Sequence, residues 1–449
     1  MLRLSVDKLL PGMRVGLPIY HPKRSGSILL NSGSMLSSGA IGHFHKMKIR
    51  TVWIEHPSFG TVRRFIKPGI LQTYEELRSG AADIIESLVS SDGKSWPKRG
   101  EAESVIQRMI LEMVAERGPL VYVDDPPPSD RSSQLTHAAS TCFLTGLLSL
   151  QMHAYIQRAR RTASATPHQE ELHLCMGAFL HDVGLRKIPA ASYEHWVESG
   201  EEHDKDWQEH VNYGYELAHR FLDTAGAIAV LNHHQYFDHT GFPHKLDWEG
   251  QAQSQGGESV HVFARVLTAA DQFDELKHRP NGEVWPTVRA LKHFLDKSVW
   301  SRIDPRAGQA LFHVVPAFLP GMEVRLSSGD CGIVIDWKPG NPCRPAVAIV
   351  NDYSELICSD EDWKREDREK NDSDGLHCDL KSGQSDGLMN YGGDEQFVHP
   401  FRTVDLARTP SLSIVEAEGV DVSEDQFMIP DQLLPKTKAG KVYSLLEAA

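Results

Sequence analysis

The chain has 449 residues, of which 40% are hydrophobic, and it carries a formal net charge of −14. This length exceeds one compact domain, and the apolar content is sufficient for a real core, so we expect several modules. The acidic balance argues against a protein that coats DNA or RNA, because phosphate backbones call for a basic surface. One locally positive pocket for a small phosphorylated ligand is still compatible with it.

The six cysteines are scattered and form no CxxC pair. This distribution is typical of a reducing compartment rather than of a disulfide framework. The first residues show no apolar signal segment, and no run of about 18 apolar residues occurs along the chain. We therefore expect a cytoplasmic protein without a membrane span.

Residues 1–60 are predicted to form a small β-rich module, with strand-like segments at 27–30 and 51–54. Residues 61–128 are predicted to be connecting helices, because apolar residues recur there at helical spacing. The proline-rich segment 124–129 ends them and marks a domain boundary.

Residues 129–318 are predicted to be mainly helical, and residues 319–358 to form a second small β-module. Residues 359–449 are acidic and poor in aliphatic side chains, which favours a largely disordered tail. The expected fold class is a multidomain α+β protein, in which an all-α domain is flanked by small β-rich modules.

Histidine is concentrated in the helical region: 17 of the 23 histidines lie between His137 and His313. Histidine is a common metal ligand. His181 and Asp182 close an apolar helix, where two ionisable side chains would be costly unless partnered, and metal coordination removes that cost. Gly184 follows as a plausible left-handed cap. Taken singly, any one of these histidines is more readily explained as an ordinary interior residue.

Asp271 continues the apolar face of a predicted helix, four residues after Leu267. No basic residue of that helix lies within a turn of it, although a buried salt bridge to Arg265 or Arg279 is an alternative. Together with the histidines that end or begin neighbouring helices, the chain offers five imidazoles and two carboxylates: His137, His181, Asp182, His210, His233, His234 and Asp271. This mixture suits two first-row transition ions, such as Fe or Mn, better than Mg. A bridging Asp182 would hold them about 3.5–4 Å apart, the separation that polarises a phosphoryl group and activates a hydroxide.

The ordered series resembles the HD-GYP subgroup of the HD phosphohydrolase superfamily over residues 130–318, in the sequence His137, His181-Asp182, His210, His233-His234-x3-Asp238-x2-Gly241-Phe242-Pro243 and Asp271. The first 60 residues resemble the small domain often attached to such proteins. The resemblance implies an all-α HD-type catalytic domain with two divalent transition ions that hydrolyses cyclic di-GMP to pGpG or GMP. It implies that His137, His181, Asp182 and Asp271 surround one ion, that His210, His233 and His234 bind the other, and that Asp182 bridges. His181, Asp182 and His234 would carry the catalysis.

The chain departs from the family pattern at several positions. Leu185 stands where the family has the lysine of HDxGK, with Arg186 and Lys187 directly after it, and Phe242 replaces the tyrosine of GYP. The substrate contacts expected from the resemblance are Arg186, Lys187, Phe242, Pro243 and Arg279. Ser133 stands where some relatives have the glutamate of a third metal site, so two ions are predicted.

Three functions are compatible with these residues. The first is an active cyclic di-GMP phosphodiesterase. The second, favoured by Leu185, is a degenerate domain that binds cyclic di-GMP or proteins with little turnover. The third is a hydrolase of another phosphate ester, against which the HH-x6-GFP segment argues. The partners expected are a cyclic dinucleotide and, through the N-terminal domain, signalling proteins, with no DNA or RNA.

Overall fold

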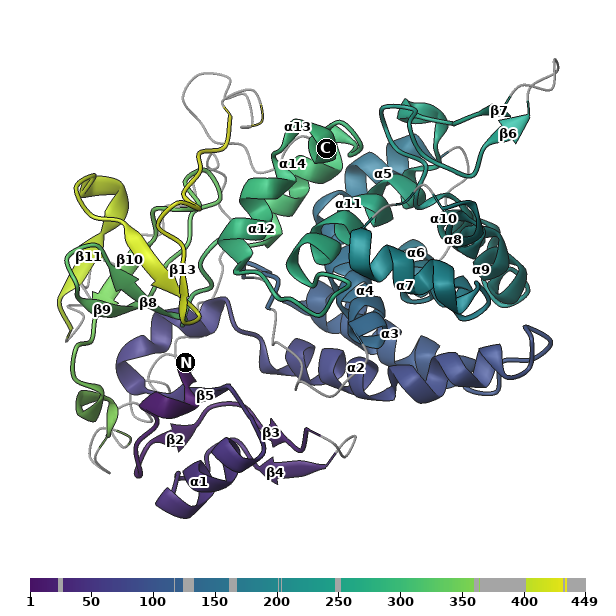
Figure 1. Ribbon diagram of the computed structural model, residues 1–449. Coiled ribbons are helices and arrows are strands. Elements are labelled where there is room, and N and C mark those ends of the chain that lie inside the picture. Colours follow the sequence, from purple (N-terminus) through teal and green to yellow (C-terminus); the bar gives the residue numbers. More distant parts are fainter. Residues whose placement is uncertain are drawn as a thin grey trace, which may run out of the picture.

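The computed structural model describes residues 1–22, 27–116, 118–123, 133–160, 168–200, 202, 204–246, 252–358, 363, 401–430 and 433. A small β-rich module, a long pair of helices, a helical domain and a second sheet follow one another along the chain (Figure 1). Among these residues, no helix combines the length and the apolar character that crossing a bilayer requires.

The N-terminal module contains a three-stranded antiparallel sheet with β5 (Thr51–Glu55) between β1 (Leu2–Ser5) and β2 (Arg14–Val15). A two-stranded sheet of β3 (Ile19–Tyr20) and β4 (Ile28–Leu30) and helix α1 (Ser38–Lys46) complete it. The hydroxyl of Ser37 accepts a hydrogen bond from the Ala40 amide and caps α1. The two strand segments predicted from composition are both present.

Two helices connect this module to the helical domain. They are α2 (Pro68–Val89), which begins on a proline, and α3 (Arg99–Ala115), and a 3-10 helix, η2 (Pro57–Arg64), precedes them. Proline is favoured at the first helical position because it has no amide hydrogen to satisfy there. Helix α2 packs against both α3 and the first helix of the next domain.

The helical domain is built around four helices that pack on one another, namely α4 (Ser133–Gln151), α6 (Gln169–Leu180), α10 (Thr224–Asn232) and α11 (Val262–Lys277). Almost every residue of α11 is buried, because other helices surround it. The remaining elements are α5 (His153–Ala159), η3 (Val183–Arg186), α7 (Ala190–Ser199), α8 (Lys205–Gln208), α9 (His210–Ala218), β6 (Lys245–Leu246), β7 (Ala252–Gln253), η4 (Gly257–Ser259), α12 (Thr287–Phe294), α13 (Lys297–Trp300) and α14 (Pro305–Val314).

A six-stranded antiparallel sheet follows, with strand order β11-β10-β9-β8-β12-β13. Its strands are β8 (Glu323–Leu326), β9 (Cys331–Val334), β10 (Ala346–Ile349), β11 (Thr403–Asp405), β12 (Ile414–Ala417) and β13 (Val420–Asp421). The prediction of a largely disordered tail is therefore wrong for residues 401–430. Some of their few apolar side chains, among them Leu406, Ile414 and Val422, are buried, and an average over the acidic segment hides them. Residues 364–400 and 434–449 lie outside the described part.

The two small modules are in direct contact. The Arg3 amide donates to the Gly321 carbonyl over 2.7 Å, and the buried Arg3 guanidinium pairs with Glu418 at 3.2 Å. The second sheet also contacts the helical domain, where Arg289 pairs with Asp425 at 3.0 Å. The flanking modules thus pack against each other, and the second of them also packs against the domain that carries the histidines.

Candidate metal centre

The structure brings all seven predicted ligands together in two adjoining groups. One group comprises His137, His181 and Asp271, and the other Asp182, His210, His233 and His234; within each group the ligand atoms lie within 4.8 Å of one another. The ends of helices position most of them: His181 and His233 directly follow α6 and α10, and His210 begins α9. His137 and Asp271 project from within α4 and α11.

Asp182 lies between the two groups, with one carboxylate oxygen facing each. Its Oδ2 is 3.5 Å from Nε2 of His181 and 3.7 Å from Nε2 of His137. Its Oδ1 is 3.5 Å from Nε2 of His210 and 3.5 Å from Nε2 of His233. A carboxylate in this position can bridge two ions.

Asp271 faces histidines rather than arginines. Its Oδ1 is 3.0 Å from Nε2 of His137 and 3.2 Å from Nε2 of His181. Its Oδ2 is buried and has no hydrogen-bond partner among the described residues, an arrangement that is costly unless a cation fills it. The alternative salt bridges are not formed, because Arg265 pairs with Asp304 and Arg279 lies over the ring of Trp285.

The histidine rings are oriented by bonds at their other nitrogen. For three of them a backbone carbonyl three residues earlier accepts from Nδ1 at 2.7 Å: Ala178 for His181, Trp207 for His210 and Val230 for His233. A carbonyl can only accept, so the proton is on Nδ1 and the Nε2 lone pair is free to bind an ion. The donor set and this orientation fit two transition ions.

Asp274 holds His137, and the sequence prediction missed it. Its Oδ2 is 2.7 Å from Nδ1 of His137, while its Oδ1 accepts from the Tyr122 hydroxyl at 3.2 Å and lies 3.0 Å from Nδ1 of His278. Asp274 is fully buried. The signal was available, since this carboxylate follows Asp271 by three residues on the same helix and therefore lies on nearly the same face.

His234 is held by a second network that the sequence did not reveal. Its Nδ1 lies 3.0 Å from the Tyr236 hydroxyl, which donates to Glu202 at 2.8 Å. Arg302 stacks over the Tyr236 ring at 4.6 Å and pairs with Glu202 at 3.3 Å. Glu202 and Arg302 are distant in sequence and belong to no motif, so no spacing rule could have found them.

The two groups differ in their proton affinity. Burial alone would lower the pKa of His137, but hydrogen bonds to Asp271 and Asp274 raise that pKa well above its ordinary value. Burial lowers the pKa of His210 to about 4, and burial together with the nearby His233 and His210 lowers the pKa of His234 well below its ordinary value. His210 and His234 are therefore neutral and ready to coordinate, whereas His137 must release a proton to bind an ion.

Two glycines allow the backbone to approach the ligands closely. A Cβ on Gly184 would overlap the His210 carbonyl oxygen and lie 2.5 Å from the Gly214 nitrogen, and a Cβ on Gly241 would overlap the His234 carbonyl oxygen. The prediction that Gly184 is a left-handed cap is wrong: it lies within η3 and is not among the residues with positive φ. Gly184 is needed because η3 lies directly on α9.

An apolar wall adjoins the second group of ligands. Phe242 is buried and stacks on His234 with ring centroids 4.6 Å apart. Leu185, at the position of the expected lysine, is also buried, in a cluster formed by Leu185, Ile188, Trp196, Trp207, Val211 and Phe242. At this position the chain therefore presents an aliphatic wall, into which a charge would fit poorly.

The other predicted substrate contacts are placed differently. Lys187 pairs with Asp92 at 2.5 Å, in the loop after α2, so its ammonium has a partner outside the centre, as the guanidinium of Arg279 does. Pro243 is half-buried and its carbonyl accepts from Gln235. Arg186 is exposed and is the last residue of η3, four residues after Asp182.

A helical domain with a His-Asp pair at a helix end and further histidines and an aspartate from neighbouring helices is an HD domain, and residues 133–307 match the HD domain family. Three relatives are phosphodiesterases by name. The cyclic di-GMP phosphodiesterase response regulator RpfG of Xanthomonas campestris pv. campestris (strain 8004) is 29% identical over 224 residues, 47% of this chain and 54% of that protein. The cyclic di-GMP phosphodiesterase PA4108 of Pseudomonas aeruginosa is 25% identical over 181 residues, 39% of this chain and 40% of that protein.

The third relative, the 3'3'-cGAMP-specific phosphodiesterase 3 of Vibrio cholerae serotype O1, is 26% identical over 148 residues, 32% of this chain and 29% of that protein. The chain thus spans about half the length, or less, of the relatives it matches. The HD-domain match and these relatives, together with the ordered histidines and aspartates and the GFP segment, support assigning the helical domain to the HD-GYP family.

Proposed function

We propose that the chain is a phosphodiesterase that hydrolyses cyclic di-GMP to pGpG or GMP with two divalent transition ions, Fe or Mn. The observation that carries the proposal is Asp182, whose two oxygens face two separate groups of histidines. His137, His181 and Asp271 would hold one ion, and His210, His233 and His234 the other. When bound, such a pair would polarise a phosphoryl group and activate a water molecule as the nucleophile.

The residues of the chain prepare this site in three ways. The carbonyls and Asp274 fix the imidazole rings, so that little reorganisation is needed when an ion binds. Phe242 and Leu185 form an apolar wall beside His234, which excludes water on that side. Arg186, exposed at the end of η3 four residues after Asp182, is the cation we assign to the substrate phosphate in place of the missing lysine.

The substrate assignment rests on the relatives. Two of them are named for cyclic di-GMP and the third for 3'3'-cGAMP. Both substrates are cyclic dinucleotides with two phosphodiester bonds, so the same two-ion chemistry applies to either. The choice between them depends on base contacts that the metal centre does not make.

The test is hydrolysis of both cyclic dinucleotides by the full chain loaded with Mn or Fe. We expect turnover of cyclic di-GMP, and a loss in His234→Ala on the order of 100-fold or more, since this ligand serves the reacting centre directly. His153→Ala is the matched control, because His153 pairs with Glu171 outside the centre. If the metal-loaded wild type binds cyclic di-GMP tightly without hydrolysing it, the chain is a binding module and the proposed enzymatic function is wrong. If it hydrolyses 3'3'-cGAMP alone, the proposed substrate is wrong.

A further inference from the structure

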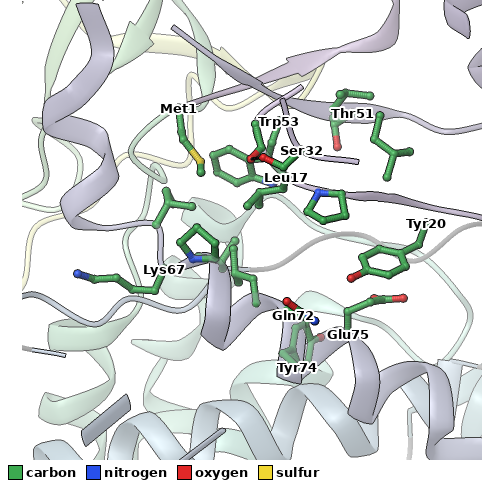
Figure 2. A pocket seen from close by; sticks show the side chains of 18 of the residues that line it. Met1, Leu17, Tyr20, Ser32, Thr51, Trp53, Lys67, Gln72, Tyr74 and Glu75 are labelled. Atoms are coloured by element: carbon green, nitrogen blue, oxygen red, sulfur yellow. Dashed lines mark hydrogen bonds between the residues drawn. The ribbon is translucent and has the colours of Figure 1, made fainter. Parts of the chain in front are cut away.

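A cavity of about 700 Å³ lies between the N-terminal module and α2, away from the metal centre. This volume is within the range of roughly 300–1,000 Å³ typical of small-molecule sites, which often lie where two domains meet. Figure 2 shows Leu17, Ser32 and Trp53 of the module on one side and Gln72, Tyr74 and Glu75 of α2 on the other. No step of the proposed hydrolysis uses this cavity.

The side chains that line the cavity are partly aromatic and aliphatic, and the charged ones among them carry an excess of positive charge. Its aromatic and aliphatic residues include Leu17, Tyr20, Trp53 and Leu71. Its three acidic residues are each paired with a base, in the pairs Glu55–Arg63, Glu75–Arg78 and Glu116–Lys67. Lys48 and Arg50 also line the cavity, are exposed, and form no ion pair with any described residue. An amphiphilic anion would match both features.

The cavity is linked to the metal centre through two short connections. The Tyr74 hydroxyl is 3.1 Å from Oγ of Ser140, and the Tyr74 ring stacks on Phe143 with centroids 4.8 Å apart. Ser140 and Phe143 lie on α4, the helix that carries His137. On the second path, Val123 lines the cavity, and the hydroxyl of its neighbour Tyr122 donates to Asp274.

The geometry points to a regulatory site: the cavity between the N-terminal module and α2 binds a small organic anion with an aromatic or aliphatic body, and its occupancy alters the metal affinity of the centre through Tyr74 and Tyr122. The anionic group would contact Lys48 and Arg50, and the body would lie against Trp53, Tyr20 and Leu71. The inference concerns binding and metal affinity, so it stands apart from the choice of nucleotide substrate.

Binding is tested with the fluorescent aromatic sulfonate 8-anilinonaphthalene-1-sulfonate and the full chain. We expect one site, weakened roughly 2- to 30-fold by Lys48→Gln with Arg50→Gln, the range for the loss of two exposed ion pairs. Gln72→Trp should weaken it further, because an indole would occupy the mouth of the cavity. The control pair Lys46→Gln with Arg220→Gln removes two exposed charges elsewhere and should change nothing.

Melting curves for each variant separate a loss of the site from a loss of the fold. The neutral probe N-phenyl-1-naphthylamine measures the apolar part, and the Lys48 and Arg50 variants should leave its binding unchanged. Sulfonate binding that survives both the charge variants and Gln72→Trp would place the probe elsewhere and overturn the proposed site.

Coupling is tested by titrating Mn²⁺ into the apoprotein with and without saturating probe. We expect a change of about fivefold or more in Mn²⁺ affinity, the lower range of ordinary allosteric coupling. Tyr74→Phe keeps the stacked ring, removes the bond to Ser140, and should reduce the change while the probe still binds. Tyr20→Phe is the matched control, a tyrosine of the same cavity that forms no hydrogen bond or ring contact with a described residue of α4. An unchanged Mn²⁺ affinity in the probe-saturated wild type would overturn the regulatory role.

Discussion

Replacing Asp274 with asparagine removes one negative charge beside the metal centre and leaves every metal ligand in place. The carboxylate is fully buried and serves His137, His278 and Tyr122. An asparagine of the same shape can accept through its oxygen only, and its amide group would face donors. At least one of these three partners therefore loses its acceptor.

Two separate magnitudes follow. Loss of a carboxylate that orients a histidine ligand typically lowers metal affinity about 10- to 100-fold, or roughly 1.4–2.7 kcal/mol. The buried donor left without a partner lowers the free energy of unfolding by about 1–3 kcal/mol. The first effect depends on pH: Asp274 helps to raise the pKa of His137, so the variant also weakens proton competition. The apparent loss of affinity should be smaller in acidic than in alkaline buffer.

The assay is Mn²⁺ titration of the apoprotein at several pH values, with chemical denaturation alongside. Glu171→Gln is the control, because Glu171 is a buried carboxylate that accepts from Nδ1 of His153 at the same 2.7 Å but lies outside the centre. Its metal affinity should equal that of the wild type. If Asp274→Asn binds Mn²⁺ as tightly as the wild type in alkaline buffer, orientation of His137 by Asp274 contributes nothing, and the reasoning is wrong.

Gly184→Ala should lower the free energy of unfolding by about 1–3 kcal/mol, since its Cβ would meet rigid backbone. Gly60→Ala is the control and should not lower it, because a Cβ at Gly60 would have no atom within 4 Å. Guanidinium titration measures the free energy of unfolding of both variants. Leu185→Lys should lower unfolding free energy by about 1 kcal/mol or more, because it places a charge in an apolar cluster, and a rise in turnover would show that the ammonium reaches phosphate instead. In the folded apoprotein the pKa values of His137 and His181 are raised, so their protonated forms stabilise the fold. This contribution to the free energy of unfolding is fully present below about pH 6.5 and is lost as the pH rises through the raised pKa values. Metal affinity should change in the opposite direction, which calorimetry in buffers of different ionisation enthalpy detects as proton release.

The candidate ligands that the structure brings together could be proposed from the sequence because several of them occupy positions where the local pattern carries information. His181 and Asp182 end an apolar helix, and Asp271 continues an apolar face. The helical period therefore shows that these are ionisable side chains at positions where apolar ones are expected. The partition into two groups was available only through the family resemblance, and the Asp182 geometry agrees with it.

The parts that could not be predicted depend on contacts between distant segments. Gly184 is required because α9 crosses η3, and nothing in the local sequence announces that crossing. Lys187 pairs with Asp92 from the loop after α2, a contact that the local sequence does not indicate. The strands at 403–421 were missed because composition averages over a segment, whereas a few buried side chains decide whether a strand pairs.

The late strands β11, β12 and β13 also determine what a shortened chain would do. In the complete sheet, β10 pairs with β11 and β8 pairs with β12. A chain ending at residue 358 would retain only β8, β9 and β10, with both outer strands offering unpaired amides and carbonyls to solvent. Such open edges are templates for strand addition between molecules. A fragment cut there would therefore self-associate through the sheet remnant even with an intact metal centre, and aggregation of the fragment would say nothing about the stability of the helical domain.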